Sequence, residues 1–306
     1  MKNILITGSS GFIGINLINY FHDKFFKIFP YSRQLGFEYK KITREYLDKE
    51  GINTIIHLAG KAHDLKRVSS EADYYLVNTE FTKQIFDAFL GSDAKVFITI
   101  SSVKAVADVL DNELNEDYIP NPVTHYGKSK LLAEQYILSK KLPDNKRVYI
   151  LRPTMIHGPG NKGNLSLLYK MVSKGYPWPL GSFENKRSFC SIQNLYFVIN
   201  EIIERNDIPS GVYNISDNDP VSTIELIQLI ANNQKKKSII LYLPKTLIFF
   251  IAKLGDLLHL PLNTERLQKL TETYLVSNKK LISALGKELP VTSKEGLIKT
   301  FQSFNQ

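Results

Sequence analysis

The sequence contains little of what disulfide-bonded or metal-binding proteins are built from. Among its 306 residues Cys190 is the one cysteine, so no disulfide can form within the chain and no multi-cysteine metal site can be assembled. His63, His125 and His157 lack the spacing of metal ligands, and we expect no bound metal. Because a chain so poor in cysteine suits a reducing compartment, a cytoplasmic location is expected.

Long apolar segments are also missing. The most apolar stretch, 238–252, is broken by Pro244 and Lys245, and its parts are far shorter than the roughly 20 residues that cross a bilayer, so no membrane span is expected. The apolar start of the chain runs directly into a glycine turn, which argues against a secretion signal. Apolar spacing over 247–258 predicts a helix, and packing inside a second lobe is favoured over a partner-binding or membrane-surface face.

Basic residues outnumber acidic ones, 39 to 30, which gives a net charge of +9. Basic proteins often bind nucleic acids, but the lysines are scattered and only Lys235–Lys237 form a run, so nucleic-acid binding is not expected. The positive potential suits attraction of a diphosphate-bearing substrate and cofactor.

Short β-rich apolar runs alternate with helical patterns in the first half of the chain, which predicts an α/β fold with a Rossmann-type, doubly wound parallel sheet. The expected strands are 3–7, 27–31, 54–58, 95–101 and 147–151, and the expected helices are 12–21, 69–90 and 126–140. Beyond Arg152 proline and glycine become frequent, and a smaller, mostly helical lobe is expected. We place a dinucleotide-binding domain at 1–160 and a substrate lobe at 161–306. Short strands at 188–191 and 212–215 could return to the main sheet, in a segment near 188–216.

A glycine pattern lies where the first expected strand meets the first expected helix, with glycines at every third residue of Gly8–Gly14. Glycine permits a tight turn and close backbone approach, and a helix N-terminus offers N–H groups and a positive dipole to a pyrophosphate. The pattern therefore predicts a dinucleotide site. Its expected contacts from this turn are Gly8, Ser10, Gly11, Phe12, Ile13 and Gly14.

The end of the second expected strand indicates which dinucleotide binds. An acidic residue there would accept hydrogen bonds from the adenosine ribose of NAD, but the sequence has Ser32 and Arg33 and no carboxylate. Because arginine suits the 2′-phosphate, NADP is favoured over NAD.

A tyrosine and a lysine four residues apart, Tyr126 and Lys130, share one face of a predicted helix. The ordinary tyrosine pKa of about 10 makes it a poor base near neutrality, and a neighbouring ammonium is expected to lower that pKa. Ser101 and Ser102 end an expected strand at the sheet edge that carries the chemistry in such folds. The Ser102 hydroxyl is expected to orient a substrate oxygen while Tyr126 exchanges its proton.

These elements, in this order, resemble the extended short-chain dehydrogenase/reductase family, in its nucleotide-sugar epimerase and dehydratase branch. The resemblance covers nearly the whole chain and implies a nicotinamide-dependent enzyme with Ser102, Tyr126 and Lys130 as catalytic residues. It also implies cofactor contacts beyond the glycine turn, at Ser32, Arg33, Leu58, Ala59, Gly60, Lys61, Asn78, Ser101, Tyr126, Lys130 and Pro153. Substrate contacts are implied for Lys104, Asn164 and Arg187, and a homodimer is a further expectation.

Departures from the family pattern narrow the expected reaction. Ser102 is followed by Val103 and Lys104 where similar 4,6-dehydratases have an Asp-Glu pair, so dehydration is disfavoured. Ala105–Ala107 stands where many 4-epimerases have Val-Tyr-Gly. The chain looks most similar to reductases of UDP-4-keto-N-acetyl-6-deoxyhexosamines and to UDP-N-acetylhexosamine 4-epimerases, which serve surface-polysaccharide precursor synthesis.

The leading hypothesis is a 4-ketoreductase acting on a UDP-linked sugar, and the alternative is a UDP-sugar 4-epimerase. A non-catalytic dinucleotide-sensing protein is a third hypothesis. It is disfavoured because such proteins often lose the tyrosine or the lysine, whereas Tyr126 and Lys130 are both present.

Overall fold

The computed structural model describes residues 1–32, 41–61, 70–161, 163–258 and 263–304. Its centre is a six-stranded sheet of order β2-β1-β3-β4-β5-β8, in which all neighbouring strands are parallel. The strands are β1 (Lys2–Thr7), β2 (Phe26–Tyr31), β3 (Thr54–His57), β4 (Val96–Ile100), β5 (Arg147–Pro153) and β8 (Gly211–Ile215). The strand order reverses beside β1, as in doubly wound folds, and the predicted fold class is confirmed.

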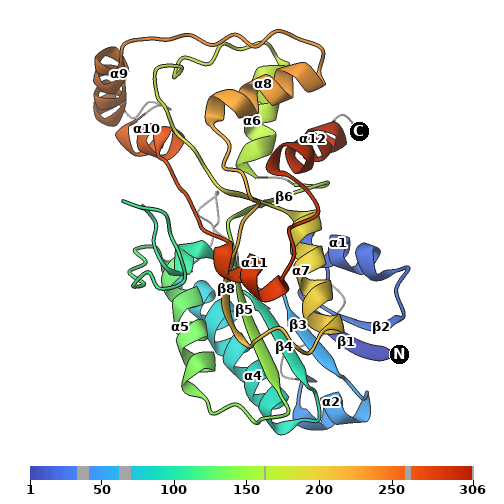
Figure 1. The fold of residues 1–306 in the computed structure, drawn as a ribbon. Coiled ribbons are helices and arrows are strands. Elements are labelled where there is room, and N and C mark those ends of the chain that lie inside the picture. Colours follow the sequence, from blue (N-terminus) through green and yellow to red (C-terminus); the bar gives the residue numbers. More distant parts are fainter. Residues whose placement is uncertain (33–40, 62–69, 162, 259–262, 305–306) are drawn as a thin grey trace.

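Helices cover both faces of this sheet (Figure 1). Continuous apolar runs such as Ile4-Leu5-Ile6, fully buried, form strands that need such cover on both sides. One face packs against α1 (Phe12–Phe21), α7 (Ile192–Glu204) and α11 (Lys279–Leu285). The other packs against α2 (Arg44–Lys49), α4 (Phe81–Gly91) and α5 (His125–Ser139).

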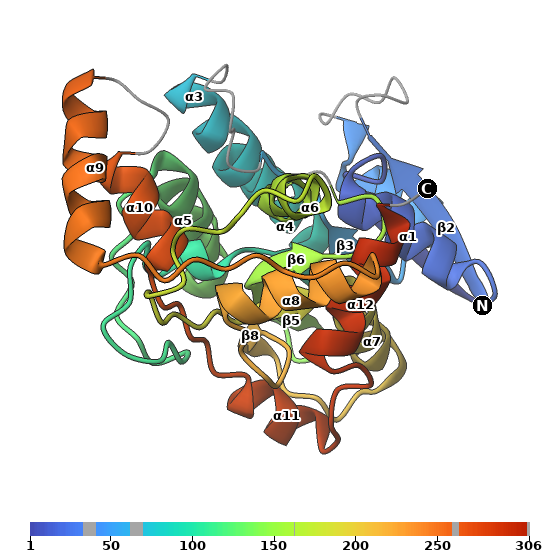
Figure 2. The ribbon, with the colours of Figure 1, turned by 90° about the horizontal axis from the view of Figure 1, so that it is seen from above.

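A second lobe stands beyond the carboxyl edge of the sheet. Its helices are α6 (Asn164–Ser173), α8 (Thr223–Asn233), α9 (Lys245–Leu258), α10 (Thr264–Thr271) and α12 (Ser293–Ser303). They share an apolar core that includes Trp178, Leu226 and Phe301. Seen from above, α9 and α10 lie on one side of the lobe and α12 on the other (Figure 2). We propose that the chain first enters the second lobe near the predicted boundary at 160. Because α7, β8 and α11 return to the sheet, no single cut in the chain separates the two lobes.

The strands predicted in the first half of the chain are confirmed within two residues, and 212–215 returns to the main sheet as β8. The prediction for 188–191 is wrong about its sheet. This strand, β7 (Phe189–Ser191), pairs with β6 (Met155–His157) in a separate two-stranded sheet, because β8 occupies the place beside β5. The predicted helix 69–90 is built from α3 (Glu71–Tyr74), a π-helical segment η3 (Tyr75–Glu80) and α4.

The helix predicted over 247–258 is confirmed as α9, and its favoured packing in the second lobe is confirmed for one side of the helix only. Three residues of α9 are buried, Ile248, Ala252 and Gly255, and most of its large apolar side chains are exposed. The reason is that α9 lies at the outer side of the lobe, where the core can cover only one narrow stripe of it. No helix in the described ranges has the length and apolarity needed to cross a bilayer.

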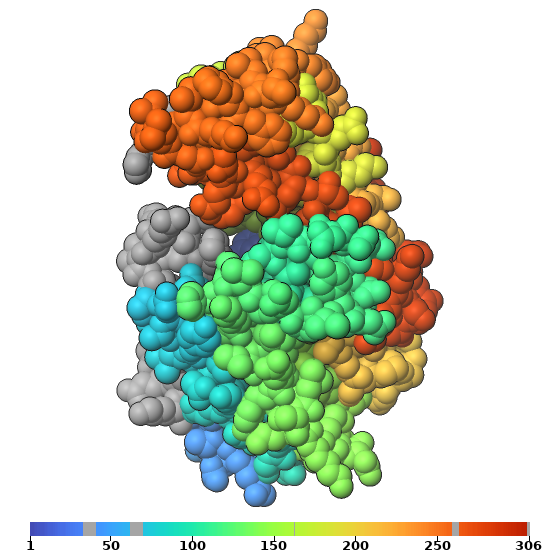
Figure 3. Space-filling view, turned by 90° about the vertical axis from the view of Figure 1, so that its left-hand side faces the viewer, coloured from blue at the N-terminus to red at the C-terminus, as the bar shows by residue number. Residues whose placement is uncertain are grey.

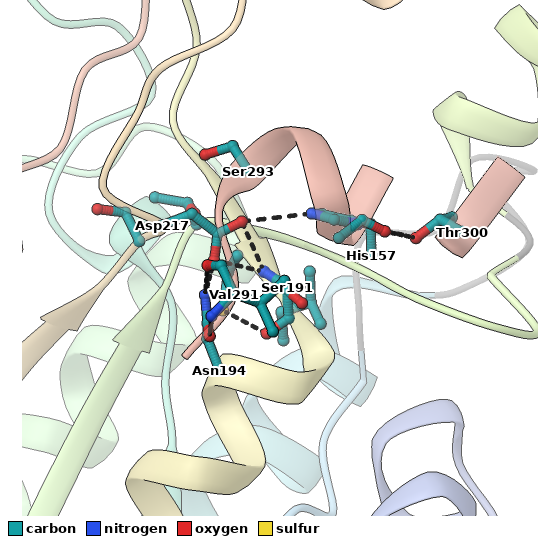
Figure 4. Close-up of polar contacts among 12 residues, drawn as sticks. His157, Ser191, Asn194, Asp217, Val291, Ser293 and Thr300 are labelled. Carbon is teal, nitrogen blue, oxygen red and sulfur yellow. Dashed lines mark hydrogen bonds and ion pairs between the residues drawn. The ribbon is translucent and has the colours of Figure 1, made fainter. Parts of the chain in front are cut away.

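Asp217 anchors the second lobe to the sheet (Figure 4). Its buried carboxylate accepts hydrogen bonds from the backbone N–H of Ser191, at 2.9 and 3.0 Å, and from the Asn194 amide at 2.6 Å. His157 Nε2 lies 3.5 Å from the same carboxylate, and its Nδ1 lies 2.9 Å from the hydroxyl of Thr300 in α12. One carboxylate thus joins β7, α7 and, through His157, the last helix.

We predict that Asp217→Ala lowers the free energy of unfolding by about 3 kcal/mol, because it leaves buried donors of Ser191 and Asn194 without an acceptor. Urea unfolding measures this change. The control is Asp219→Ala, since Asp219 is exposed and its substitution should cost less than about 0.5 kcal/mol. Equal stability of the two variants would contradict the anchoring role.

Candidate active site

The glycine turn between β1 and α1 is shaped by backbone contacts that leave no room for side chains. Gly8 has φ +69°, and a Cβ there would lie 2.6 Å from the backbone nitrogen of Ala59. A Cβ on Gly14 would lie 2.5 Å from the carbonyl oxygen of Gly8. Gly11 is the N-cap of α1, with no side-chain cap. The first turn of α1 therefore keeps N–H groups for an anion at the carboxyl edge of the sheet.

Asn78 fixes the segment that leaves β3. Its side-chain oxygen accepts from the backbone N–H of Lys61 at 2.7 Å, and its Nδ2 donates to the carbonyl of Lys61 at 3.1 Å and to the hydroxyl of Ser129 at 3.0 Å. Asn78 is fully buried in η3. It joins the exit of β3, with Leu58, Ala59 and Gly60, to α5. These bonds hold the segment after β3 in place against α5.

The start of α5 is held against the loop after β4. Thr124 caps the helix through the N–H of Gly127, and the carboxylate of Asp108 accepts from the N–H groups of Val123 and Thr124 at 2.8 and 3.1 Å. A Cβ on Gly127 would collide with the carbonyl oxygen of Lys104, in the short helix η4 (Val103–Ala105). This contact brings the loop that carries Ser102 against the first turn of α5.

The structure brings Ser102 next to Tyr126, close enough for its hydroxyl to act on the Tyr126 phenol. Burial raises the pKa of the Tyr126 phenol above its ordinary value, and the Ser102 hydroxyl partly offsets this rise. The expected lowering of this pKa by Lys130 is therefore wrong for this structure. The physical reason is that burial disfavours phenolate while the ammonium is directed to a backbone carbonyl. The phenol is therefore protonated at neutral pH in this structure.

Lys130 lies beneath this pair, with its Nζ donating to the carbonyl of Ile100 at 2.9 Å. A Cβ on Gly60 would come within 2.9 Å of the same Nζ, so the exit of β3 passes directly over the ammonium. Burial lowers the pKa of Lys130 to about 8, and the nearby Glu134 opposes that shift. Lys130 therefore stays mostly charged at neutral pH.

A buried ion pair below the site is the main feature that the sequence analysis did not predict. Glu134 accepts from Arg152 through Nε at 3.0 Å and Nη2 at 2.5 Å, and both side chains are almost fully buried. Ser101 donates to the same carboxylate, so its hydroxyl is directed toward α5. The sequence did offer one signal for Glu134. It follows Lys130 by four residues, which places both on one face of the same helix.

The expected substrate-binding cations lie close to each other but are engaged with protein groups. Lys104 Nζ donates to the carbonyl of Asp108 at 2.7 Å and lies 4.0 Å from the ring centroid of Tyr274. Arg187 pairs with Glu272 at 3.2 Å. Arg187 also contributes to the electrostatic environment of Lys104, whose pKa burial lowers.

Other expected site residues are distributed as follows. Asn164 is the first, exposed residue of α6, and Pro153 is buried at the end of β5. Arg33 and His63 lie outside the described residues. The space-filling view shows a hollow between the two lobes, with blue atoms of the N-terminal segment at its bottom (Figure 3).

The sequence and the fold were compared with known proteins. The model of the "NAD dependent epimerase/dehydratase family" matches residues 4–216. The chain belongs to this family. It is 32% identical to a UDP-glucose 4-epimerase of Vibrio cholerae, over 100% of this chain and 96% of that protein. It is 28% identical to the N-acetyl-alpha-D-glucosaminyl-diphospho-ditrans,octacis-undecaprenol 4-epimerase of Escherichia coli O157:H7, over 98% and 94% of the two chains. The solved structure of MoeE5 with UDP-glucose and NAD shares the fold, with a TM-score of 0.76 and 20% identity over 99% of this chain and 98% of that one.

The family membership makes this chain an NAD(P)-dependent enzyme, and two side chains fit a dinucleotide at the glycine turn. The hydroxyls of Ser9, in the turn, and Ser32, after β2, are buried and have no hydrogen-bond partner among the residues that the structure describes. Buried hydroxyls of this kind need a partner, and the ribose and phosphate groups of a dinucleotide supply several. The residues present therefore suit the cofactor of the NAD dependent epimerase/dehydratase family.

The histidines at the site have protein neighbours. His125 Nδ1 lies 3.1 Å from the hydroxyl of Tyr75, and its Nε2 lies 3.1 Å from Glu71. His57 bridges Thr7 and Thr82 at 2.8 and 2.9 Å, and burial lowers its pKa to about 3. His57 is therefore neutral and serves the core. Within the described ranges, no three His, Cys, Asp or Glu side chains gather as metal ligands.

We predict that the burial of Lys130 is visible in the pH dependence of stability. Below about pH 8 the ammonium is protonated in both the folded and the unfolded chain, so it does not change how the free energy of unfolding varies with pH. Between pH 8 and the ordinary lysine pKa of about 10.4, the unfolded chain binds the proton that the folded chain has lost, so stability rises with pH. The free energy of unfolding of the wild type, minus that of Lys130→Met, should rise by about 2 kcal/mol from pH 8 to 10. Urea titrations at several pH values measure this difference. A constant difference would contradict the buried position of the ammonium.

Proposed function

We propose that this enzyme is a 4-epimerase of a nucleotide-linked sugar, with UDP as the nucleotide and NAD(P) as a retained cofactor. The observation that carries the proposal is similarity over essentially the whole chain to two proteins named as 4-epimerases. It reverses the order favoured by the sequence alone, which ranked 4-keto reduction first. The neighbouring Ser102 and Tyr126, above the Lys130 ammonium, support either reaction.

In the proposed reaction the side chains move one proton. Bound NAD(P) supplies hydride acceptance from carbon 4 and hydride return. Tyr126 would first release its own phenolic proton to solvent. Ser102 would then orient the hydroxyl on carbon 4, and the Tyr126 phenolate would take the proton of that hydroxyl while the hydride leaves carbon 4. The ammonium of Lys130 donates to the carbonyl of Ile100 in this structure, and it would have to turn toward Tyr126 to stabilise the phenolate. The 4-keto sugar would then rotate in the site and present its opposite face to the cofactor. Tyr126 would return the proton to the oxygen on carbon 4 as the hydride returns to that opposite face.

A second candidate is reduction of a 4-keto sugar with NADPH, and two observations favour it. Burial raises the pKa of Tyr126, so the phenol is ready to give a proton to a carbonyl oxygen. The end of β2 has Tyr31 and Ser32 and no carboxylate, which suits a 2′-phosphate.

We propose that the diphosphate of the substrate binds near Lys104, Asn164 and Arg187. Arg187 would exchange its contact with Glu272 for the phosphates. The reaction is proposed to occur in the cytoplasm, consistent with the single, buried Cys190, and to serve surface-polysaccharide precursors. A homodimer remains part of this proposal.

The two candidates differ in how they handle the cofactor. We predict that purified protein releases NAD or NADP on denaturation and that it interconverts a UDP-sugar and its 4-epimer without added nicotinamide. Mass spectrometry of the released cofactor and chromatography of the products measure both. The panel includes UDP-glucose, UDP-N-acetylglucosamine and undecaprenyl-diphosphate-linked N-acetylglucosamine. Stoichiometric consumption of NADPH with a 4-keto substrate, and no epimerisation, would establish the second candidate instead.

We predict that Tyr126→Phe lowers turnover by about 10²- to 10⁴-fold, because the proton loses its donor and acceptor, while the amount of bound cofactor stays unchanged. The control is Tyr136→Phe on the same helix. The Tyr136 hydroxyl bonds to Asp87 at the surface, so this variant should keep full turnover. Wild-type activity in Tyr126→Phe would refute the proposed proton transfer.

A further inference from the structure

Glu272 is an acidic side chain among the cations that are proposed to bind the substrate diphosphate. Its Oε1 lies 3.2 Å from Nη2 of Arg187. Burial lowers the pKa of Lys104, and Glu272 is the carboxylate that opposes this shift most. Because Lys104 follows Ser102 by two residues, the carboxylate belongs to the same region as the proposed chemistry. A negative side chain in a site for a negative ligand requires an explanation.

The backbone of Arg187 is held from both sides. Its N–H donates to the carbonyl of Val221 at 3.0 Å, and its carbonyl accepts from the N–H of Val221 at 2.9 Å. On the other side, Tyr274 donates to the carbonyl of Lys186 and accepts from the N–H of Ser188, both at 2.9 Å. The start of the arginine side chain is therefore fixed without the Glu272 carboxylate.

Backbone carbonyls also hold the guanidinium of Arg187. Its Nε donates to the carbonyl of Glu272 at 3.3 Å, and its Nη2 donates to the carbonyl of Lys269. Both acceptors lie at the C-terminal end of α10. Of the bonds that the structure describes for this guanidinium, one involves the Glu272 side chain. Removing the negative charge of that side chain would therefore leave Arg187 in place.

The Glu272 carboxylate does not serve α10 either. Glu272 is the C-cap of this helix, where the helix dipole is negative and an acidic side chain is unfavourable. Within the described part of the chain, its carboxylate accepts a hydrogen bond from Arg187 and from no other group. Asp108 also acts on Lys104, but its carboxylate holds the start of α5. The described partner of the Glu272 carboxylate is thus a cation of the proposed phosphate site.

The pair of Arg187 and Glu272 is partly shielded from water. Their side chains are exposed by 22% and 17%, so salt and water screen their attraction less than that of a surface pair. In the empty enzyme the carboxylate supplies the partner that a poorly hydrated guanidinium needs. When a diphosphate arrives, the same carboxylate occupies the cation that the phosphates would use, and it repels them.

We propose that Glu272 is an internal competitor for the diphosphate of the substrate, which pairs with Arg187 in the empty enzyme and limits how tightly a nucleoside diphosphate binds. This inference rests on the proposed function, because it needs a substrate with a diphosphate. Substrate and product of a 4-epimerase carry the same diphosphate. Tighter binding of this shared group would slow product release without accelerating the reaction, so a competing carboxylate favours turnover.

The test compares the wild type with Glu272→Gln, which removes the charge and keeps the length of the side chain and an oxygen acceptor for Arg187. Isothermal titration calorimetry of the purified protein with its bound cofactor measures the Kd of UDP, of inorganic pyrophosphate and of uridine. We expect Glu272→Gln to bind UDP and pyrophosphate about tenfold more tightly, because a like charge is removed from beside the anion. The affinity for uridine, which has no phosphate, should not change.

Glu265→Gln is the matched control, because it removes the same charge from the same helix. The Glu265 carboxylate lies 2.6 Å from Nζ of Lys269, and both side chains are mostly exposed. The affinity of this variant for UDP should stay within about twofold of the wild type. Equal melting temperatures of the two variants show that Glu272→Gln is folded.

Unchanged or weaker binding of UDP and pyrophosphate in Glu272→Gln would overturn the inference, and so would binding of neither ligand by either protein. An equal gain in Glu265→Gln would also overturn it, because net charge alone would then explain the result. Tighter UDP binding in a protein that does not epimerise UDP-sugars would support the inference and contradict the proposed reaction. Epimerisation by a protein whose UDP affinity ignores the substitution would contradict the role of Glu272 alone.

Discussion

At three points in this enzyme one backbone segment approaches another group so closely that only the hydrogen of a glycine fits, and these contacts position the reacting groups. Gly8 lies against the exit of β3, Gly60 passes over the Lys130 ammonium, and Gly127 lies against the loop that carries Ser102. The contact of Gly127 fixes Ser102 relative to the first turn of α5. The contact of Gly60 places Lys130 under the segment expected to line the cofactor. A methyl group at Gly8 or Gly127 would meet backbone and move an element, whereas one at Gly60 would displace the Lys130 side chain.

The same closeness explains the electrostatics of the site. Burial raises the pKa of Tyr126 and lowers that of Lys130, so each group alone favours its neutral form. The carboxylate of Glu134 keeps Lys130 mostly charged near neutrality, and Arg152 balances that carboxylate below the site. A buried charge without such a partner would be strongly destabilising. The charged state of Lys130 therefore depends on a pair that never reaches the substrate.

Local patterns were enough to predict the parallel sheet, the glycine turn and the meeting of Ser102 with Tyr126. Each depends on periodicity or on the order of strand ends, and both are visible in the chain. The pairing of Glu134 with Arg152, the bonds of Asn78 and the direction of the Tyr126 pKa were not predictable in this way. They depend on which side chains become buried together across segments far apart in sequence. The prediction that 188–191 returns to the main sheet was wrong for a related reason. The place beside β5 is taken by β8, a segment that comes later in the chain.

The net charge of +9 was first assigned to attraction of a diphosphate, but the basic residues differ in how well their positions in the fold suit that role. Lys104 and Arg187 lie between the lobes, where burial lowers the pKa of each and protein carbonyls or Glu272 already engage them. Cations that have lost their water gain most from an arriving anion, so these two suit a specific phosphate contact. Lys235–Lys237 are exposed just after α8, where Lys236 donates to the carbonyl of Ser173 at the end of α6, and hydration and salt weaken any single contact there. Lys104 and Arg187 are therefore better suited to a diphosphate than Lys235–Lys237 are.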